Sequence, residues 1–262
     1  MKTRVVILTS SLNGTAAHHV PFLLASKEIE VALVIYNDGT DNRIKSKYRL
    51  KLKKLIKIGI FGAINGIKMR KWYQEDLKQH LNIQNLEKVC LDNNIQFNTT
   101  HTINCELTKQ LMTTAKADIG ISLGNGYIAK SVFCIPKHGM INIHHEILPA
   151  YQNAQSVIWQ IFNGSKETGY TIHKIDRNID TGEILFQEKV PILFQETLAA
   201  TVTSTYASVL EHSAKGLVKV LASFDLYFKN AYSQGIGNSY TTPTFNQYKK
   251  IKQQFYRLKN NF

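Results

Sequence analysis

The sequence has few cysteines and lacks a long hydrophobic run near its start. Three cysteines occur in 262 residues, Cys90, Cys105 and Cys134, and no two of them have the CxxC spacing. This argues against a thiolate zinc site and against a disulfide framework. The N-terminal segment MKTRVVILTSS contains four consecutive apolar residues, too few for the core of a signal peptide or for a membrane span. We therefore expect a soluble globular protein of the reducing cytoplasm.

Acidic residues are absent from one basic segment, Arg43 to Tyr73, which contains eleven lysines and arginines. The rest of the chain balances 21 basic against 19 acidic residues, so the net charge of +13 arises largely in this segment. Its apolar residues recur at helical spacing, which predicts a basic amphipathic helix: Ile44, Tyr48, Leu52, Leu55 and Ile56. Three interpretations are open, namely a solvated helix packed on the domain, a contact with an anionic membrane surface or carrier, and a nucleic-acid face, which fits least.

Strand-like apolar runs alternate with helical patterns over the first 143 residues. The runs predict strands at 4–8, 29–36, 94–102, 117–123 and 140–143, and helical patterns occupy 74–93 and 106–116. Since strands that alternate with helices form parallel sheets, the sequence predicts an α/β protein of Rossmann-like type. We expect helices on both faces of a mostly parallel sheet, with ligands at the carboxyl ends of its strands.

The last third of the chain has a different pattern. Segments 168–175 and 184–192 predict an antiparallel pair joined by the polar loop DRNIDTGE. Residues 197–228 predict one long helix or two shorter ones, and the polar, aromatic tail predicts only a short helix. We therefore expect a main domain over residues 1–192, with 43–73 as an insertion, and a helical extension over 193–262. The apolar helix of that extension is a candidate surface for a homodimer.

The loop after the first strand, SSLNGT, is followed by a helical segment. Because backbone amides at the start of a helix bind anions, Ser10, Asn13 and Gly14 are candidates for holding a phosphate or carboxylate of a substrate. The loop matches neither GxGxxG nor the P-loop pattern, and a plain tight turn is the alternative.

A cluster of polar residues follows the apolar run at 140–143, in the stretch INIHHE. Asn142 and His144 lie two apart, so on a strand both side chains leave the same face and can act on one ligand atom. An amide N–H can donate to a developing oxyanion and an imidazole can exchange a proton near neutral pH, as acyl transfer to an amine requires. Asp180, in the loop RNIDTG, is the best candidate for a carboxylate that assists proton transfer.

Two other interpretations of this cluster are open. A metal site would need three or four ligands from His138, His144, His145 and Glu146, but a strand points its adjacent histidines to opposite faces. The HHE sequence also lacks the HExxH spacing of helical zinc sites, so we expect no metal. In the last interpretation, one histidine caps the strand and the other is solvated.

The segment MINIHHEILPAYQNAQSVIWQIFNGSKETGYTIHKIDRNIDTGEIL resembles the core of the formyltransferase superfamily that uses 10-formyltetrahydrofolate. Its members include glycinamide ribonucleotide, methionyl-tRNA and sugar-nucleotide N-formyltransferases. The superfamily pattern is an Asn-x-His strand end, a Leu-Pro step, a Tyr-Arg-Gly turn, a Trp, an Asn-Gly pair, a GxTxH-type strand and a closing Asp-Thr-Gly. The chain matches it at Asn142, His144, Leu148, Pro149, Tyr151, Trp159, Asn163, Gly164, Gly169, Thr171, His173, Asp180, Thr181 and Gly182.

The resemblance implies that Asn142, His144 and Asp180 form the catalytic set, with 10-formyltetrahydrofolate as co-substrate. It also places the pterin against the loop GNGYIAK, which precedes the Asn-x-His strand. The folate contacts we expect are Gly126, Tyr127, Ile128 and Asp176, and the acceptor contacts are Ser10, Asn13, Gly14, Tyr151 and Gln152.

The chain departs from the superfamily pattern in two places. His145 and Glu146 replace Pro and Ser, and Gln152 and Asn153 replace Arg and Gly. Because asparagine can adopt the left-handed conformation that glycine normally fills, we expect the turn to survive. The departures bear on the identity of the acceptor, and an inactive relative is the alternative.

Chain length and the tail favour one branch of the superfamily. A tRNA-formylating relative would carry a full RNA-binding domain after residue 192, and a glycinamide ribonucleotide enzyme would end soon after it. The tail resembles the endings of short amino-sugar formyltransferases. We therefore expect the acceptor to be a dTDP- or UDP-linked 4-amino-4,6-dideoxyhexose for surface polysaccharide, such as the O-antigen of lipopolysaccharide. Methionyl-tRNA and glycinamide ribonucleotide are alternatives, and so is a noncatalytic relative that binds a membrane or nucleic acid through 43–73.

Overall fold

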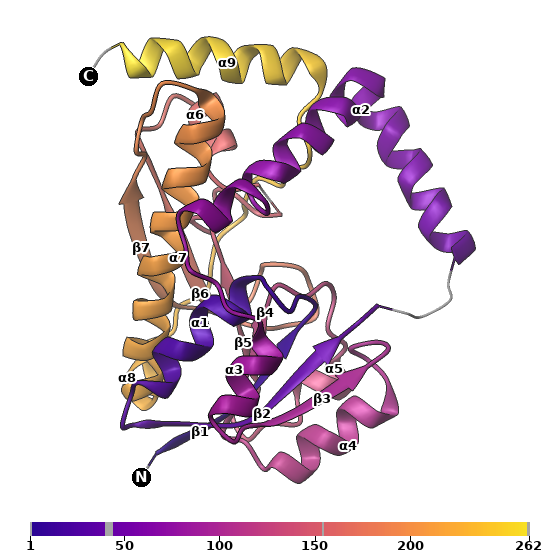
Figure 1. The fold of residues 1–262 in the computed structure, drawn as a ribbon, viewed down its shortest axis with the longest axis vertical. Helices are drawn as coiled ribbons and strands as arrows, with labels where there is room; N and C mark the ends of the chain where they lie inside the picture. The colour runs from indigo at the N-terminus through magenta and orange to yellow at the C-terminus, as the bar shows by residue number, and fades with distance from the viewer. Residues whose placement is uncertain (1, 40–43, 154, 261–262) are drawn as a thin grey trace.

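The computed structural model of the protein describes residues 2–39, 44–153 and 155–260, and the side chains of 44–51 lie outside this description. Its centre is a seven-stranded sheet with the strand order β3-β2-β1-β4-β5-β6-β7 (Figure 1). The parallel strands are β1 (Thr3–Thr9), β2 (Ile29–Asn37), β3 (Gln96–Thr100), β4 (Ile119–Leu123) and β5 (Met140–His144). Two antiparallel strands, β6 (Glu167–Lys174) and β7 (Ile184–Pro191), complete one edge. The prediction of a mostly parallel α/β sheet is confirmed.

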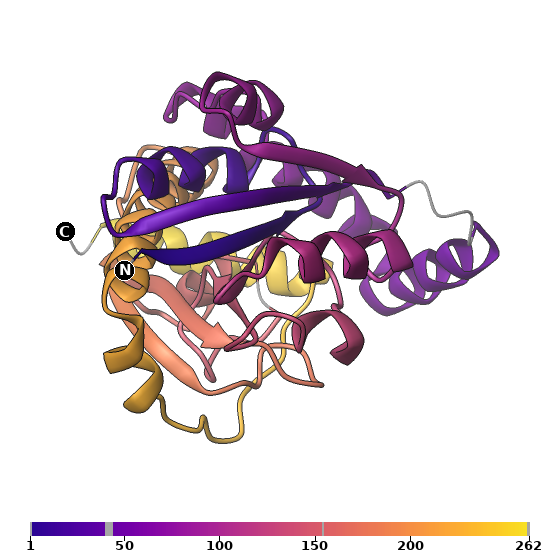
Figure 2. The same cartoon turned by 90° about the horizontal axis from the view of Figure 1, so that it is seen from below.

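The central strand β1 shows why helices cover both faces. Its side chains alternate between two hydrophobic clusters, Val5 and Ile7 toward one and Val6 and Leu8 toward the other, as the period of a strand dictates. The first cluster lies beneath α1 (Thr15–Leu24), α3 (Leu86–Asp92) and α7 (Leu198–Ala222), and the second beneath α4 (Glu106–Ala115) and α5 (Lys130–Phe133). Figure 2 shows β1 and β2 between α1 on one side and α4 on the other.

The basic segment forms helix α2 (Ile44–Trp72), as the apolar spacing predicts, but the helix is kinked. Gly59 has φ 73° and ψ 167°, a conformation that glycine adopts readily and that ends one helical arm and starts the next (Figure 1). The C-terminal arm is anchored by Met69 and Trp72, which are buried in a third hydrophobic cluster with residues of α9. None of the helices in the described ranges has the length and apolarity needed to cross a membrane.

Two predicted helices differ from the structure. The segment 74–93 contains a short 3-10 helix, η1 (Asp76–Gln79), and then α3, because the Asn85 side chain accepts hydrogen bonds from the backbone N–H groups of Glu87 and Lys88 and starts a new helix. The tail holds a 15-residue helix, α9 (Phe245–Lys259), rather than a short one. The missed signal is the capping box formed by Thr244 and Gln247.

The region 197–228 contains two helices, α7 and α8 (Phe224–Lys229), the second of the two predicted alternatives. Helix α7 contributes Val209, Leu217 and Val220 to the main core, in the same cluster as β1. Helix α9 packs instead against α2 and the short helix α6 (Ile158–Phe162). The expected division at residue 192 remains a prediction. Helix α7 follows this residue in the sequence, but it packs against the core of the main domain.

Candidate active site

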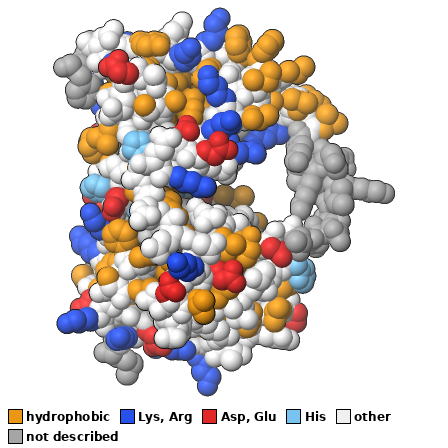
Figure 3. Space-filling view, viewed as in Figure 1, with side chains coloured by type: hydrophobic (Ala, Val, Ile, Leu, Met, Phe, Trp, Pro, Cys, Tyr) orange, Lys and Arg blue, Asp and Glu red, His pale blue; other side chains and the backbone are white. Residues whose placement is uncertain are grey.

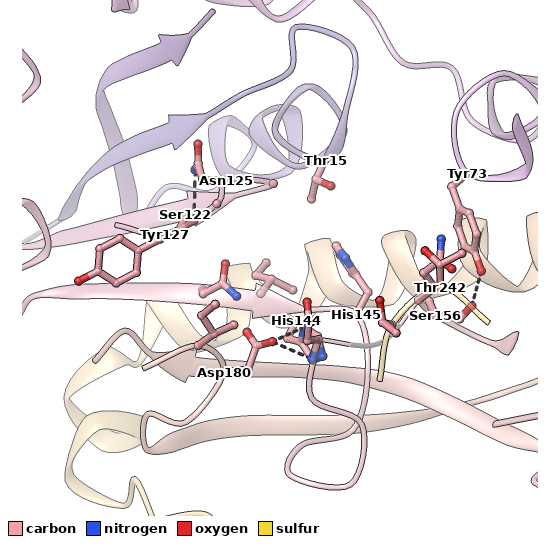
Figure 4. Close-up of a pocket in the computed structure, with 18 of the residues that line it drawn as sticks. Thr15, Tyr73, Ser122, Asn125, Tyr127, His144, His145, Ser156, Asp180 and Thr242 are labelled. Atoms are coloured by element: carbon pink, nitrogen blue, oxygen red, sulfur yellow. Dashed lines mark hydrogen bonds and ion pairs between the residues drawn. The ribbon is translucent and has the colours of Figure 1, made fainter. Parts of the chain in front are cut away.

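Strands β5 and β6 bring the three predicted catalytic residues together. Asn142 and His144 lie at the carboxyl end of β5, with both side chains half-buried on one face of the strand. Asp180 belongs to the loop between β6 and β7, and its Oδ2 atom lies 3.6 Å from Nδ1 of His144 (Figure 4). The proximity of Asp180 to His144, 36 residues apart in sequence, therefore comes from the turn of the chain after β6.

The hydrogen bonds of His144 fix which of its nitrogen atoms can exchange a proton. Its Nε2 atom lies 2.8 Å from the carbonyl oxygen of Tyr151, and a carbonyl can only accept, so Nε2 carries a proton and donates it. The Nδ1 atom is left facing the carboxylate of Asp180. Proton exchange with Asp180 or with a reacting group is therefore confined to Nδ1.

The backbone and side chain of the segment after β5 hold Asp180 in place. The backbone N–H of Asn153 donates to Oδ2 of Asp180 at 3.1 Å, and Nε2 of Gln152 donates to the Asp180 carbonyl at 3.3 Å. Asn153 has φ 51°, the left-handed conformation expected of the residue that replaces glycine. The prediction that this turn survives the substitution is confirmed.

His173 is a member of the site that was not among the predicted site residues. Its Nδ1–H donates to the Lys174 carbonyl at 2.9 Å, and burial lowers its pKa, so the ring is neutral and Nε2 offers a lone pair. The amide of Asn142 donates to that lone pair from Nδ2 at 3.2 Å, which orients the amide and leaves its second N–H for a ligand. The structure pairs Asn142 with His173 across the two strands, and the GxTxH-type strand of the superfamily pattern, which ends at His173, is the sequence signal that could have identified it.

Strand geometry separates the two adjacent histidines, as predicted. His144 faces Asp180, whereas the ring of His145 packs edge-on against Tyr206 and His19. Burial lowers the pKa of His145 to about 3, so its imidazole is neutral. Across the described part of the chain, no three His, Cys, Asp or Glu side chains are grouped so that they could hold a metal ion.

One cavity of about 1030 Å³ contains these residues and extends past them in two directions. This volume is at the upper end of the range for small-molecule binding sites, which suits two substrates rather than one. Figure 4 shows Tyr127 at one end, Tyr73, Ser156 and Thr242 at the other, and Asp180 with His144 between them. We call the first the loop end and the second the α2 end.

All four predicted folate contacts line the cavity: Gly126, Tyr127 and Ile128 in the loop that forms its loop end, and Asp176. The side chain of Asn104 fixes this loop twice, since it donates to the Tyr127 carbonyl at 3.1 Å and accepts from the Ala129 N–H at 2.7 Å. Asn125 ties the loop to β1 through a bond to the Leu8 carbonyl. The loop therefore presents backbone groups from a fixed position, as recognition of a flat heterocycle requires.

None of the five predicted acceptor contacts is among the residues that line the cavity: Ser10, Asn13, Gly14, Tyr151 and Gln152. Ser10 donates to Asn125, and Gly14 lies just before α1, where its carbonyl accepts from the N–H of His18. The Tyr151 ring stacks on Tyr240, while its carbonyl holds His144. Ser10, Tyr151 and Gln152 contact residues of the site, and contact of all five residues with an acceptor stays a prediction.

The α2 end contains polar residues that were not predicted to line the site, Gln155 and Ser156, next to His145. Three buried side-chain atoms have no hydrogen-bond partner within the described residues: His145 Nε2, Gln155 Oε1 and Ser156 Oγ. All three residues line the cavity. Lys54 and Arg70 of α2 also line it, and neither forms an ion pair with a carboxylate in the described chain. The wall at this end therefore combines polar side chains with positive charge.

Glu146 lies behind the site and holds the chain rather than a ligand. Its side chain is buried and accepts hydrogen bonds from the Val157 N–H at 3.1 Å and from the Gln160 amide, which connects the end of β5 to the start of α6. Burial raises the pKa of this carboxyl well above its ordinary value. The departure from the superfamily pattern at residue 146 thus replaces a small residue with a buried, protonated acid.

We expect Glu146→Gln to stabilise the protein increasingly as the pH rises. The unfolded carboxyl ionises above about pH 4.5 while the folded one keeps its proton, so wild-type stability falls from there toward the higher folded-state pKa. Glutamine is neutral throughout and has no such loss. Thermal melts should show a gain of a few degrees at about pH 8 and almost none at about pH 5. An equal shift at both pH values would contradict a protonated Glu146.

Comparison with known proteins agrees with this geometry. The model of the formyl transferase family matches residues 66–221, more than half of the chain, and the chain therefore belongs to that family. GDP-perosamine N-formyltransferase of Brucella melitensis is 39% identical over 100 residues, 38% of this chain and 38% of the relative. Methionyl-tRNA formyltransferase of Alkaliphilus oremlandii is 32% identical over 120 residues, 45% of this chain and 39% of the relative. The matched segments thus span about two fifths of these curated relatives.

Solved structures share the fold at low sequence identity. Glycinamide ribonucleotide transformylase 1 from Symbiobacterium toebii superposes with a TM-score of 0.59 and 14% identity, over 90% of this chain and 92% of that chain. The N-formyltransferase from Helicobacter canadensis, in complex with folinic acid and dTDP-3-aminofucose, gives a TM-score of 0.52 and 20% identity over 91% and 71%. The fold is therefore that of the formyltransferases.

Proposed function

We propose that the protein transfers a formyl group from 10-formyltetrahydrofolate to the amine of a nucleotide-linked amino sugar. The observation that carries the proposal is the position of Asn142, His144 and Asp180 between the two ends of one cavity. The folate occupies the loop end and the acceptor occupies the α2 end. The formyl carbon and the amine then meet beside the three polar side chains.

The reaction follows from the groups at this meeting point. The amine nitrogen attacks the formyl carbon, and the carbonyl electrons move to oxygen to form a tetrahedral oxyanion. The free N–H of the Asn142 amide and protonated Nδ1 of His144 stabilise that negative charge. The attacking nitrogen becomes positively charged in the tetrahedral intermediate, and Asp180 takes a proton from it. Asp180 then returns this proton toward N10 of the folate, whose bond to the formyl carbon breaks. The products are an N-formylated sugar and tetrahydrofolate.

The α2 end supports an acceptor that is both polar and anionic. Gln155 and Ser156 add polar side chains to the cavity wall at this end, which suits the hydroxyls of a sugar. A diphosphate would accept from Lys54 and Arg70. Two nucleotide sugars of relatives have this combination: GDP-perosamine, from which the Brucella enzyme takes its name, and dTDP-3-aminofucose, which is bound to the Helicobacter canadensis enzyme.

Methionyl-tRNA and glycinamide ribonucleotide are the rival acceptors, because enzymes for both are similarly related to this chain. A direct test mixes purified protein with 10-formyltetrahydrofolate and each acceptor class, and follows tetrahydrofolate release together with the mass of the product. We expect formylation of a 4-amino-4,6-dideoxyhexose nucleotide. If methionyl-tRNA or glycinamide ribonucleotide were the one acceptor that is formylated, the proposal of an amino-sugar nucleotide would be refuted. No turnover with any amine would favour a noncatalytic role.

We expect Arg70→Gln to raise the KM for the acceptor about tenfold and to leave kcat nearly unchanged, because a phosphate contact far from the reacting carbon binds ground state and transition state alike. Arg257→Gln is the matched control, since Arg257 is an exposed arginine of α9 outside the cavity. Steady-state kinetics with the acceptor varied at saturating folate provide the measurement. A fall in kcat at constant KM would contradict a phosphate contact at Arg70.

A further inference from the structure

Helix α2 exposes an unusual number of large apolar side chains. Six of them are more than half exposed, and they lie on both arms of the kinked helix: Leu52, Ile56, Ile60, Phe61, Ile64 and Ile67. Ile56 is 76% exposed and Ile60 69%. We call these six residues the α2 apolar surface. Figure 3 shows hydrophobic side chains gathered near the top of α2, beside lysine and arginine side chains.

The charge around the α2 apolar surface has one sign. Lys53, Lys57 and Lys68 are exposed, and among the described residues none of the three is paired with a carboxylate. The sequence from residue 43 to 73 contains no acidic residue at all. A helix with exposed isoleucines between unpaired lysines matches two features of an anionic bilayer, its acyl region and its headgroup charge.

Other occupants fit this surface less well. A second copy of the chain would bring two arrays of lysines together, and like charges oppose such a contact. A nucleic acid would pair with the lysines through its phosphates but would leave the isoleucines in water, since phosphate contacts carry most of that affinity. A lipid surface is the partner that satisfies both the charge and the apolar side chains.

We propose that α2 docks on an anionic lipid surface and that the α2 end of the cavity lies beside it. The same helix supplies Lys54, Leu55 and Ile67 to the wall of that end, and the molecule is hollowed beneath it (Figure 3). Docking through α2 brings the acceptor end of the enzyme to the membrane surface. The isoleucines enter the boundary between headgroups and acyl chains, and the lysines stay with the lipid phosphates.

Sedimentation with vesicles tests the proposal without any assay of formyl transfer. We expect the full chain to bind vesicles of phosphatidylcholine with phosphatidylglycerol and not vesicles of phosphatidylcholine alone. The triple variant Ile56→Ser, Ile60→Ser, Ile64→Ser should lower the partition coefficient at least about tenfold, since it removes apolar side chains that are exposed and outside the cavity wall. Lys53→Gln with Lys57→Gln should lower it about tenfold on anionic vesicles.

Matched controls distinguish binding through α2 from non-specific binding through other exposed apolar or basic side chains. The triple variant Leu91→Ser, Leu226→Ser, Ile236→Ser removes equally exposed apolar residues elsewhere, and Lys88→Gln with Lys229→Gln removes exposed lysines of α3 and α8. Both controls should bind as the wild type does.

Three results would overturn the proposal: no binding of the wild type to anionic vesicles, an equal loss in the controls, or light scattering that shows the isoleucines hold a dimer together. None of these depends on the acceptor, so failure here is distinct from failure of the proposed function.

Discussion

Asp180→Asn is expected to lower kcat for formyl transfer about a thousandfold while the protein remains folded. The change removes the carboxylate that accepts the proton of the attacking amine. It preserves size, and an asparagine Oδ1 can still accept the hydrogen bond from the Asn153 backbone that positions Asp180. Rapid-mixing measurement of tetrahydrofolate release, with both substrates saturating, gives kcat directly.

Two controls make the Asp180 result specific. Thermal melting and the dissociation constant for tetrahydrofolate should be close to those of the wild type, because Asp180 is assigned to chemistry and not to folate binding. Asp225→Asn is the matched substitution, an exposed aspartate of α8 away from the cavity, and it should leave kcat unchanged. Retention of a tenth or more of wild-type kcat in Asp180→Asn would remove Asp180 from the proton transfer.

Asn142→Ala is the second large effect, an expected loss of 10²- to 10³-fold in kcat with little change in KM. The alanine removes an N–H donor that strengthens its contact only as the formyl oxygen becomes negative. Asn142→Asp should lose more, because a carboxylate of the same shape presents negative charge to the oxyanion. Steady-state kinetics of the two variants side by side give the comparison.

The order of these two losses is the informative result. If the Asp variant were as active as the Ala variant or more so, Asn142 would act through shape and not through its N–H. His173→Leu supplies a further check, since His173 accepts from Nδ2 of Asn142 and orients the amide. That variant should lose less than Asn142→Ala, because the donor is retained in a looser orientation.

Sequence patterns predicted the sheet well because a strand has a short-range signature. The alternation of Val5, Val6, Ile7 and Leu8 between two cores, and the spacing of Asn142 from His144, both follow from a period of two. The proximity of Asp180 was predictable only through the resemblance, since no local rule relates a loop to a strand 36 residues earlier. Long-range register had to come from the structure.

The residues that escaped prediction owe their roles to packing between distant segments. Gln155 and Ser156 could be placed in the cavity wall only from the structure, because burial without a partner is a property of the folded chain. The kink at Gly59 has the same origin, since an isolated glycine in a helical pattern does not by itself decide between a straight helix and two arms. The exposure of the isoleucines on α2 was also not predictable, because helical spacing of apolar residues does not say whether another part of the chain covers them.

The chain segment that holds Asp180 continues into the wall of the α2 end of the cavity. Gln152 holds the backbone carbonyl of Asp180 and Asn153 holds its carboxylate. Gln155 and Ser156, a few residues further along, line the part of the cavity proposed for the acceptor. With the acceptor proposed above, the substrate amine and its proton acceptor would be positioned by one continuous segment of the chain. We therefore expect hydrolysis of the formyl donor to be slow when no acceptor is bound.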